Sequence, residues 1–232
     1  MLHRSLTTVA GLQNDEGYRG DTVGRYTGPS CRLCRHVGEK LFLKGSRCYG
    51  VKCAIERRKR PPGVGDRGGR RRRPSDYSSR LAEKQKLRNA YGMMEKQFAT
   101  YFSKARHNTG VTGQNLLLLL ERRLDNVVFR MNFAQSRKQA RQLVLHGHFT
   151  VNGRKVDIPS FSVRSGDIVK WKESERSANV AEILGSGQIQ QPTPGWLSVD
   201  ADRRTGRVIS LPELQDSDLN IDTRLIVEFY NS

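Results

Sequence analysis

The clearest hydrophobic pattern in the chain lies between residues 120 and 171. Leu120, Leu124, Val127 and Met131 recur every three or four residues, so their spacing predicts a helix with one apolar face. The arginines of the same stretch fall outside this row. The pattern therefore places positive charge along the side of the predicted helix.

A second helix is expected to follow the first. Ser136, with Gln139 three residues later, is a capping-box pattern that marks a helix start. Ala140 and Val144 belong to the buried row of this helix, and Gly147 supplies a left-handed stop. The cations that lie off the buried row are Arg137, Lys138 and Arg141.

A small antiparallel sheet is predicted next. Residues 149–151 and 154–156 are strand-like and flank Asn152-Gly153, a strong signal for a two-residue hairpin turn. Residues 168–171 add a further strand after a turn. Two helices and a small sheet thus form one compact unit.

Elsewhere the hydrophobic pattern is less continuous. The stretch from Ser78 to His107 is predicted to be helical, with Tyr91 and Met94 among its buried positions. Residues 173–184 are polar and helix-like. Residues 194–200 and 225–230 are predicted to be strands.

Charge adds a function class to this picture. The 232 residues carry 41 Lys and Arg against 23 Asp and Glu, a net charge of +18. Residues 23–172 hold the excess, whereas residues 173–232 are net negative. The basic part is expected to face a polyanion, and the acidic end to face solvent or a protein neighbour. No apolar run approaches the ~20 residues of a bilayer span, and residues 1–23 do not form a secretory signal.

So small a unit has little interior room in which the arginines of the two predicted helices could be buried. We therefore expect them to be solvated, or neutralised by phosphates from outside the protein. On this interpretation Arg137→Ala with Arg141→Ala weakens RNA binding and leaves thermal stability nearly unchanged.

Four cysteines form two close pairs, Cys31 with Cys34 and Cys48 with Cys53. Two such pairs, one of them Cys-x-x-Cys, predict a closed structural zinc site. Four cysteines also suit an iron–sulfur cluster. Two disulfides are the alternative, which the expected reducing compartment disfavours. The cations that would offset the thiolate charge are Arg32, Arg35, Lys52, Arg57 and Arg58.

A glycine- and proline-rich basic stretch follows, RRKRPPGVGDRGGRRRRPSDY from Arg57 to Tyr77. It cannot pack a core, so we expect an extended loop that is ordered mainly by the phosphates it meets. A flexible linker is the alternative.

The segment RLDNVVFR, continued by SRKQARQLVLHGHFTVNGRKVDIPSFSVRSGD, closely resembles the RNA-binding domain of the small-subunit ribosomal protein four family. The resemblance runs in register over residues 24–232 and includes the cysteines, the Pro-Pro-Gly loop and LAEKQKLRNAYG. Inside the loop, VGDRGG replaces the usual Gln-His-Gly segment, which puts the contacts of the loop in doubt. The four filled cysteine positions resemble the zinc-type branch of the family.

The resemblance implies an α+β fold. A metal-knuckle N-terminal arm and a helical domain form residues 23–119, and an inserted αα-β small RNA-binding domain forms residues 120–182. Residues 183–232 are a C-terminal segment that returns to the first domain, with Trp196 as an anchor. Residues 1–22 are an extension, either disordered or the product of a misplaced start, because Val23 stands where the family has its initiator methionine.

The family's role implies a structural constituent of the small ribosomal subunit, in the cytoplasm or in an organelle. Family members bind small-subunit ribosomal RNA at a multi-helix junction early in assembly. They touch small-subunit protein five, at an interface linked to accuracy, and line the messenger RNA entrance with protein three. The expected RNA-binding residues here are Arg57, Arg58, Arg70, Arg71, Arg72, Arg73, Lys84, Lys86, Arg122, Arg123, Arg137, Lys138, Arg141 and Arg154.

Two other classes compete with this interpretation. An RNA-modifying enzyme would need a further catalytic domain, and residues 24–119 offer His36 and His107 but no nucleophile–base pair. We therefore expect no enzymatic activity. A zinc-dependent transcription or repair factor would explain the cysteines and the charge, but not the ribosomal-type segments after Arg73.

Overall fold

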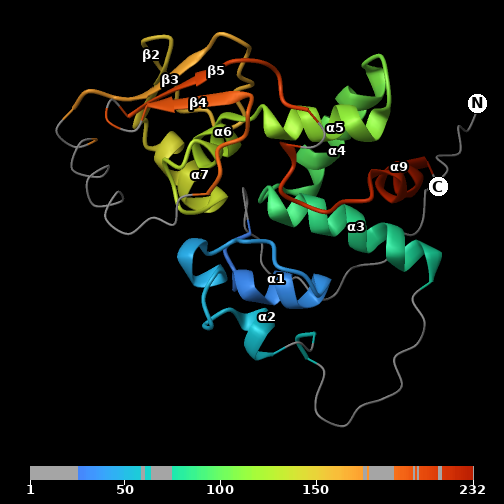
Figure 1. The fold of residues 1–232 in the computed structure, drawn as a ribbon. Coiled ribbons are helices and arrows are strands. Elements are labelled where there is room, and N and C mark those ends of the chain that lie inside the picture. Colours follow the sequence, from blue (N-terminus) through green and yellow to red (C-terminus); the bar gives the residue numbers. More distant parts are fainter. Residues whose placement is uncertain are drawn as a thin grey trace, which may run out of the picture.

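The computed structural model describes residues 26–58, 61–63, 75–174, 177, 191–200, 202, 204–213 and 216–231. The expected extension at 1–22, the loop cations at 70–73 and nearly all of the expected helix at 173–184 lie outside these residues. The described part is a helical unit beside a unit that combines helices with a sheet (Figure 1).

The helical unit is built around the long helix α3, against which α9 packs, while α4 packs on α5 (Figure 1). Leu87, Phe98, Leu116 and Ile226 are fully buried at its centre. Phe102 and Tyr230 stack with their ring centroids 4.2 Å apart, which fastens α9 to α4. The helices are α3 (Asp76–Ala90), α4 (Glu95–His107), α5 (Thr112–Glu121) and α9 (Thr223–Asn231).

The stretch predicted as one helix from Ser78 is in fact two. A corner separates α3 from α4, and Gly92 in this corner has a φ of 61°, which glycine adopts without steric cost. The corner buries Met93 at 4% exposure and leaves Met94 36% exposed. The prediction that Met94 is the buried methionine was therefore wrong, because a continuous helical period does not run through the corner.

The cysteine-bearing arm covers one side of the helical unit. Its helix α1 lies against α3, and Leu33, Leu41 and Leu43 enter the same hydrophobic core. The arm consists of α1 (Ser30–Val37), a 3-10 helix (Gly45–Cys48) and the short α2 (Ala54–Arg57).

The second unit is a five-stranded antiparallel sheet in the order β2-β1-β3-β5-β4, with α6 and α7 on one face (Figure 1). Val127, Val144, Phe149 and Val169 are fully buried between the helices and the sheet. The elements are α6 (Leu124–Arg130), α7 (Arg137–Leu145), β1 (Phe149–Val151), β2 (Arg154–Lys155), β3 (Ile168–Trp171), β4 (Leu197–Asp200) and β5 (Thr205–Val208).

Several local predictions in this unit are confirmed. The Ser136 side chain accepts a hydrogen bond from the Gln139 backbone N–H at 3.3 Å and so caps α7. Gly147 follows α7 with a φ of 70°. Asn152 and Gly153 have φ values of 51° and 78°, the two positive angles that a tight hairpin turn requires.

The helix predicted through residues 120–131 is interrupted. The chain leaves the helical path at Arg122 and Arg123, and Arg123 forms a β-bridge with Ser162. The Val163 N–H donates to the Arg122 carbonyl at 2.9 Å, and the Leu124 N–H donates to the Phe161 carbonyl at 2.8 Å. Pairing with a distant segment thus divides one apolar row into α5 and α6.

The C-terminal segment contributes secondary structure to both units. Residues 197–200 form the predicted strand, but this strand extends the sheet, and Trp196 is 3% exposed in the core of the sheet unit. The expected packing of Trp196 on the first domain was therefore wrong. Residues 225–230 belong to α9 and not to a strand, because Ile226 and Tyr230, one helical turn apart, both pack on the helical unit.

Candidate nucleic-acid interface

Three arginines of the α5–α7 region lie inside the protein. Arg123, Arg130 and Arg137 are 1%, 8% and 7% exposed. A buried guanidinium is tolerated only where carboxylates and other acceptors compensate its lost hydration. The structure supplies such partners from three different parts of the chain.

Arg130 and Arg137 share one carboxylate, Asp218, which comes from the C-terminal segment. The Asp218 Oδ1 atom is 2.8 Å from Arg137 Nη2 and 3.1 Å from Arg130 Nη2. Arg130 Nη2 is also 2.9 Å from Glu121 Oε1. Arg137 Nε donates to Asn126 Oδ1 at 2.8 Å. Both guanidinium groups are therefore neutralised within the protein.

The Arg137 guanidinium also lies over two aromatic rings. Its central carbon is 4.8 Å from the centroid of the Tyr91 ring and 4.7 Å from that of Phe129. The Tyr91 hydroxyl donates to Glu121. Burial, together with the Glu121 charge, raises the pKa of Tyr91 well above its ordinary value, so the hydroxyl remains a donor.

Asp218 remains ionised in this buried network. Burial by itself would raise the pKa of the Asp218 carboxyl, but the charges of Arg137 and Arg130 outweigh burial and hold the pKa below its ordinary value. Burial likewise opposes the charge of Arg137, and Asp218 reverses that effect, so the pKa of Arg137 is raised.

A second buried pair lies at the start of α6. Arg123 Nη2 is 2.8 Å from Asp125 Oδ2, and Arg123 Nη1 donates to the Tyr101 hydroxyl at 3.0 Å. Arg141 reaches the same carboxylate from α7, with Nη1 3.2 Å from Asp125 Oδ2. The Arg141 side chain is 20% exposed, so it lies at the edge of this pair and not inside it.

The lysines expected to contact RNA on α3 are also buried. Lys84 is 2.8 Å from Glu95, and Lys86 is 2.7 Å from Glu39, between Nζ and the carboxylate oxygen in each case. Their side chains are only 5% and 4% exposed. In this structure both lysines hold the arm and the helices of the first unit together.

These findings correct one expectation from the sequence. We expected the cations of residues 120–141 to lack partners within the protein, and that was wrong for four of them, which are Arg123, Arg130, Arg137 and Arg141. Their carboxylates lie outside the helical i, i+3 and i, i+4 spacings, and Asp218 is 81 residues beyond Arg137. No local pattern indicates such a partner, and the sequence reasoning missed Asp218 for this reason.

A basic cavity of about 400 Å³ opens beside Cys31. Among the described residues that line it, none is Asp or Glu. Arg57 and Arg58 were expected to bind RNA, and both are exposed. Arg47 was missed, although its place next to Cys48 could have indicated it. The cations that line the cavity are Arg32, Arg35, Arg47, Lys52, Arg57 and Arg58.

The remaining predicted RNA-binding residues are spread over the second unit. Arg154 is exposed on β2. Arg122 is half-buried and donates from Nε to the Val163 carbonyl at 3.1 Å. Lys138 Nζ donates to Ser30 Oγ at 2.8 Å, which links α7 to the cysteine-bearing arm.

The four cysteines are unbridged thiols in the arm: Cys31 and Cys34 lie in α1, Cys48 ends the 3-10 helix and Cys53 precedes α2. Burial raises the pKa of Cys34 and of Cys48, and the Lys44 N–H donates to Cys48 Sγ at 3.3 Å. Four sulfur donors suit zinc chemically. Among the described residues, however, no three Cys, His, Asp or Glu side chains converge as a metal would require. The zinc site therefore stays a prediction.

Comparison with known proteins decides the family. Residues 25–121 match the family described as Ribosomal protein S4/S9 N-terminal domain, and residues 122–169 match the S4 domain. A protein of Desulfitobacterium hafniense (strain DSM 10664 / DCB-2), named small ribosomal subunit protein uS4, is 55% identical over 90% of this chain and 100% of its own length. A protein of the same name from Syntrophomonas wolfei is 53% identical with the same coverage. The chain belongs to the uS4 family.

Members of the uS4 family are structural, non-enzymatic proteins of the small ribosomal subunit, so this chain is a constituent of the ribosome. The S4 domain of the chain begins at Arg122, where the structure divides α5 from α6. Among the described helices, none combines the length and apolar character that a membrane crossing requires.

Proposed function

We propose that this uS4-family chain binds small-subunit ribosomal RNA through two exposed basic surfaces. The first is the cavity beside Cys31, and the second is the exposed strand β2 of the S4 domain with Arg154 and Lys155. The cavity carries the proposal, because six cations line it and no described Asp or Glu does. Bringing phosphates to such a site releases counterions and is favourable.

The chain acts as a primary RNA binder that nucleates assembly of the subunit body. A folded RNA junction is recognised mainly by its shape, and phosphate contacts set the position of the protein on it. Separate basic surfaces on two firmly joined units suit this task. The buried pairs of Arg130 and Arg137 with Asp218 support it, since they fix the C-terminal segment against both α6 and α7.

The acidic C-terminal part faces a protein neighbour. Residues 173–232 carry ten Asp and Glu against five Lys and Arg, and so they disfavour contact with RNA. We assign this side of the chain to small-subunit protein five, with an influence on translational accuracy. We also propose that the chain contacts small-subunit protein three and lies near the messenger RNA entrance.

A zinc ion, or alternatively an iron–sulfur cluster, would be held by Cys31, Cys34, Cys48 and Cys53. When bound, the metal would cross-link the arm and supply folding energy. The spacing of the two cysteine pairs in the sequence supports this site, because four thiols in such pairs suit a structural zinc ion. A metal-bound arm would hold the basic cavity in one shape.

Sedimentation tests the proposed function. We expect one copy of the chain per small subunit, retained through washing at moderate salt, and direct binding of the purified protein to small-subunit RNA. An RNA-modifying or RNA-repair factor with the same S4 domain is the alternative. Such a factor would appear at far less than one copy per subunit, and that result would overturn the proposal.

A further inference from the structure

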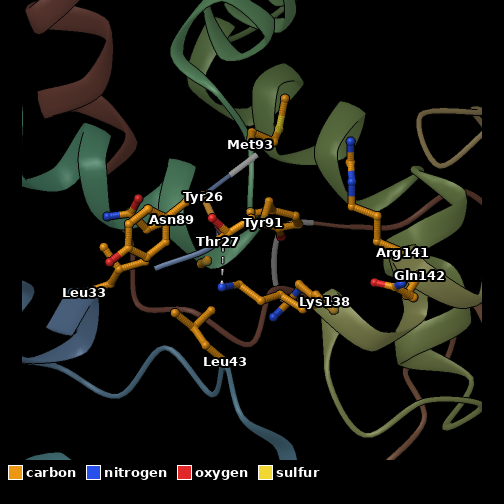
Figure 2. Close-up of a pocket in the computed structure, with 13 residues that line it drawn as sticks. Tyr26, Thr27, Leu33, Leu43, Asn89, Tyr91, Met93, Lys138, Arg141 and Gln142 are labelled. Atoms are coloured by element: carbon orange, nitrogen blue, oxygen red, sulfur yellow. Dashed lines mark hydrogen bonds between the residues drawn. The ribbon is translucent and has the colours of Figure 1, made fainter. Parts of the chain in front are cut away.

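A cavity of about 270 Å³ lies where three parts of the chain meet. Tyr26 and Thr27 come from the arm, Asn89 to Met93 come from the end of α3 and the corner after it, and α7 contributes Arg137, Lys138, Arg141 and Gln142 (Figure 2). Ligand sites occur preferentially at such junctions between units. The cavity is separate from the basic cavity beside Cys31, with which it shares no lining residue.

The α7 side of the cavity is suited to an anion. Lys138 and Arg141 line it, and among its described lining residues none is Asp or Glu. Arg141 Nη1 is 3.2 Å from Asp125 Oδ2, and Lys138 Nζ donates to Ser30 Oγ at 2.8 Å, so both cations are held in place. Their charge makes this side of the cavity favourable for an anion.

The opposite side is suited to a flat group with a polar edge. Leu33, Leu43 and Met93 provide apolar surface, and the Tyr26 ring lies nearby, with Lys138 Nζ 5.4 Å from its centroid (Figure 2). The Asn89 amide, which both donates and accepts hydrogen bonds, is the polar group of this wall. Aromatic and apolar surface beside an amide is how proteins hold an unstacked base.

We infer that this cavity takes one nucleotide of the bound ribosomal RNA, unstacked from its neighbours. The base lies against Leu43 and the Tyr26 ring with its edge at Asn89, and its phosphate lies on the α7 side of the cavity, beside Lys138 and Arg141. The volume suits one base with its sugar and excludes a duplex. This inference rests on the proposed RNA binding. It adds a site for one base to an interface that otherwise contacts the phosphate backbone of the RNA.

Filling the cavity tests the inference with RNA. Asn89→Trp should weaken binding of a small-subunit RNA fragment about tenfold, the effect of losing one stacked base, and lower its salt slope by about 0.7–0.9, because one phosphate contact is lost with the base. The 2′-hydroxyl reactivity of one or two nucleotides should return to that of free RNA while all other protections persist. Thr100→Trp, on the exposed side of α4, is the matched control. Wild-type affinity and an unchanged reactivity pattern for Asn89→Trp would overturn the inference.

A second measurement needs neither a variant nor RNA folding. In spectra of the full-length protein, at least one nucleoside monophosphate at millimolar concentration should shift the Asn89 side-chain amide and the Leu43 methyl signals. Ribose 5-phosphate and inorganic phosphate should leave Asn89 unmoved. If inorganic phosphate reproduces the whole shift, or no nucleotide gives one, the site does not hold a base. Failure of the proposed function differs from this, since wild-type protein would then not bind the RNA fragment at all.

Discussion

Arg137 and Asp218 are 81 residues apart in the chain, yet their side chains are 2.8 Å apart in an ion pair that buries the arginine and leaves the Asp218 side chain 22% exposed. The pair joins the first turn of α7 to the segment that leads into α9. It therefore ties the S4 domain to the C-terminal end. Because Arg130 shares the same carboxylate oxygen, loss of Asp218 would leave two buried cations with less compensation.

Replacing Asp218 should be destabilising. Asp218→Asn keeps the shape of the side chain but removes the negative charge, so two buried guanidinium groups lose compensation, which should cost about 1–3 kcal/mol. Urea unfolding measures the loss. Asp157→Asn is the control, because the Asp157 side chain is 55% exposed and its pair with Lys155 is 3.5 Å long. An exposed pair contributes only about 0–1 kcal/mol. Equal stability of the two variants would contradict the assigned role of Asp218.

The same carboxylate should make the protein sensitive to acid. The pKa of Asp218 is lowered in the folded state, so the unfolded chain binds a proton at a higher pH than the folded protein does. Its stabilisation is complete above the unfolded pKa of about 3.9 and is lost as pH falls through the folded pKa. The free energy of unfolding of wild type minus that of Asp218→Asn should be constant from pH 7 to 5 and shrink below pH 4. If this difference in the free energy of unfolding grew as the pH fell, the pKa of Asp218 would be raised by folding and not lowered, which would contradict the prediction.

The sequence predicted the local features well and the long-range ones poorly. The Ser136 cap, the turn at Asn152-Gly153 and the α7 stop depend on a few adjacent residues, and all three are confirmed. The interruption at Arg123 depends on pairing with Ser162, which no helical period reveals. The burial of Arg137 depends on Asp218, a carboxylate that only the fold brings close to it.

The same distinction applies to the candidate site. Charge composition predicted a polyanion partner, and the cavity beside Cys31 contains Arg57 and Arg58, two of the residues that are predicted to contact RNA. Composition alone does not distinguish an exposed cation that is available to bind phosphate from a cation that already forms an ion pair with a carboxylate of the protein. Lys84, Lys86, Arg123 and Arg137 belong to the second kind, whatever further contacts they make.

The extension of the sheet by the C-terminal segment can be tested at Gly206. This residue lies in β5 between partners on β3 and β4, and a Cβ atom there would overlap the fully buried side chain of Met131. Gly206→Ala should cost about 1–3 kcal/mol of stability, the usual cost of overpacking. In a Met131→Ala background the same change should cost much less. Gly195→Ala is the control, since a Cβ atom at Gly195 meets open space. Additive losses in the double variant would contradict this packing.

Metal binding by the arm gives a separate prediction. Cys31→Ser with Cys34→Ser should abolish binding of metal and expose roughly residues 30–55 to protease, because metal binding and folding of such an arm are coupled. Residues 120–171 should stay resistant, since their core contains none of the four cysteines. Elemental analysis of anaerobically purified wild type provides the measurement. Protein without stoichiometric zinc or iron would defeat the prediction.

The exposed and buried arginines should respond oppositely to the same substitution. Arg57→Ala with Arg58→Ala removes two exposed cations of the cavity beside Cys31, and no carboxylate lines that cavity among the described residues. Each lost phosphate contact lowers the salt slope of binding by about 0.7–0.9, so the double variant should flatten the slope by about one to two units. Its melting temperature should stay within a degree or two of wild type, because exposed substitutions change stability little.

Arg137→Ala should give the opposite result, and the comparison separates binding from folding. Removing Arg137 empties the space between Tyr91 and Phe129 and leaves Asp218 with Arg130 alone. We expect a stability loss of about 3–5 kcal/mol, seen as a large fall in melting temperature. Titrations of both variants with a small-subunit RNA fragment over a range of salt concentrations, with melting curves in the same buffers, provide the test. A stable Arg137→Ala protein with a flattened salt slope would return Arg137 to the RNA-binding surface and contradict its assignment to the core.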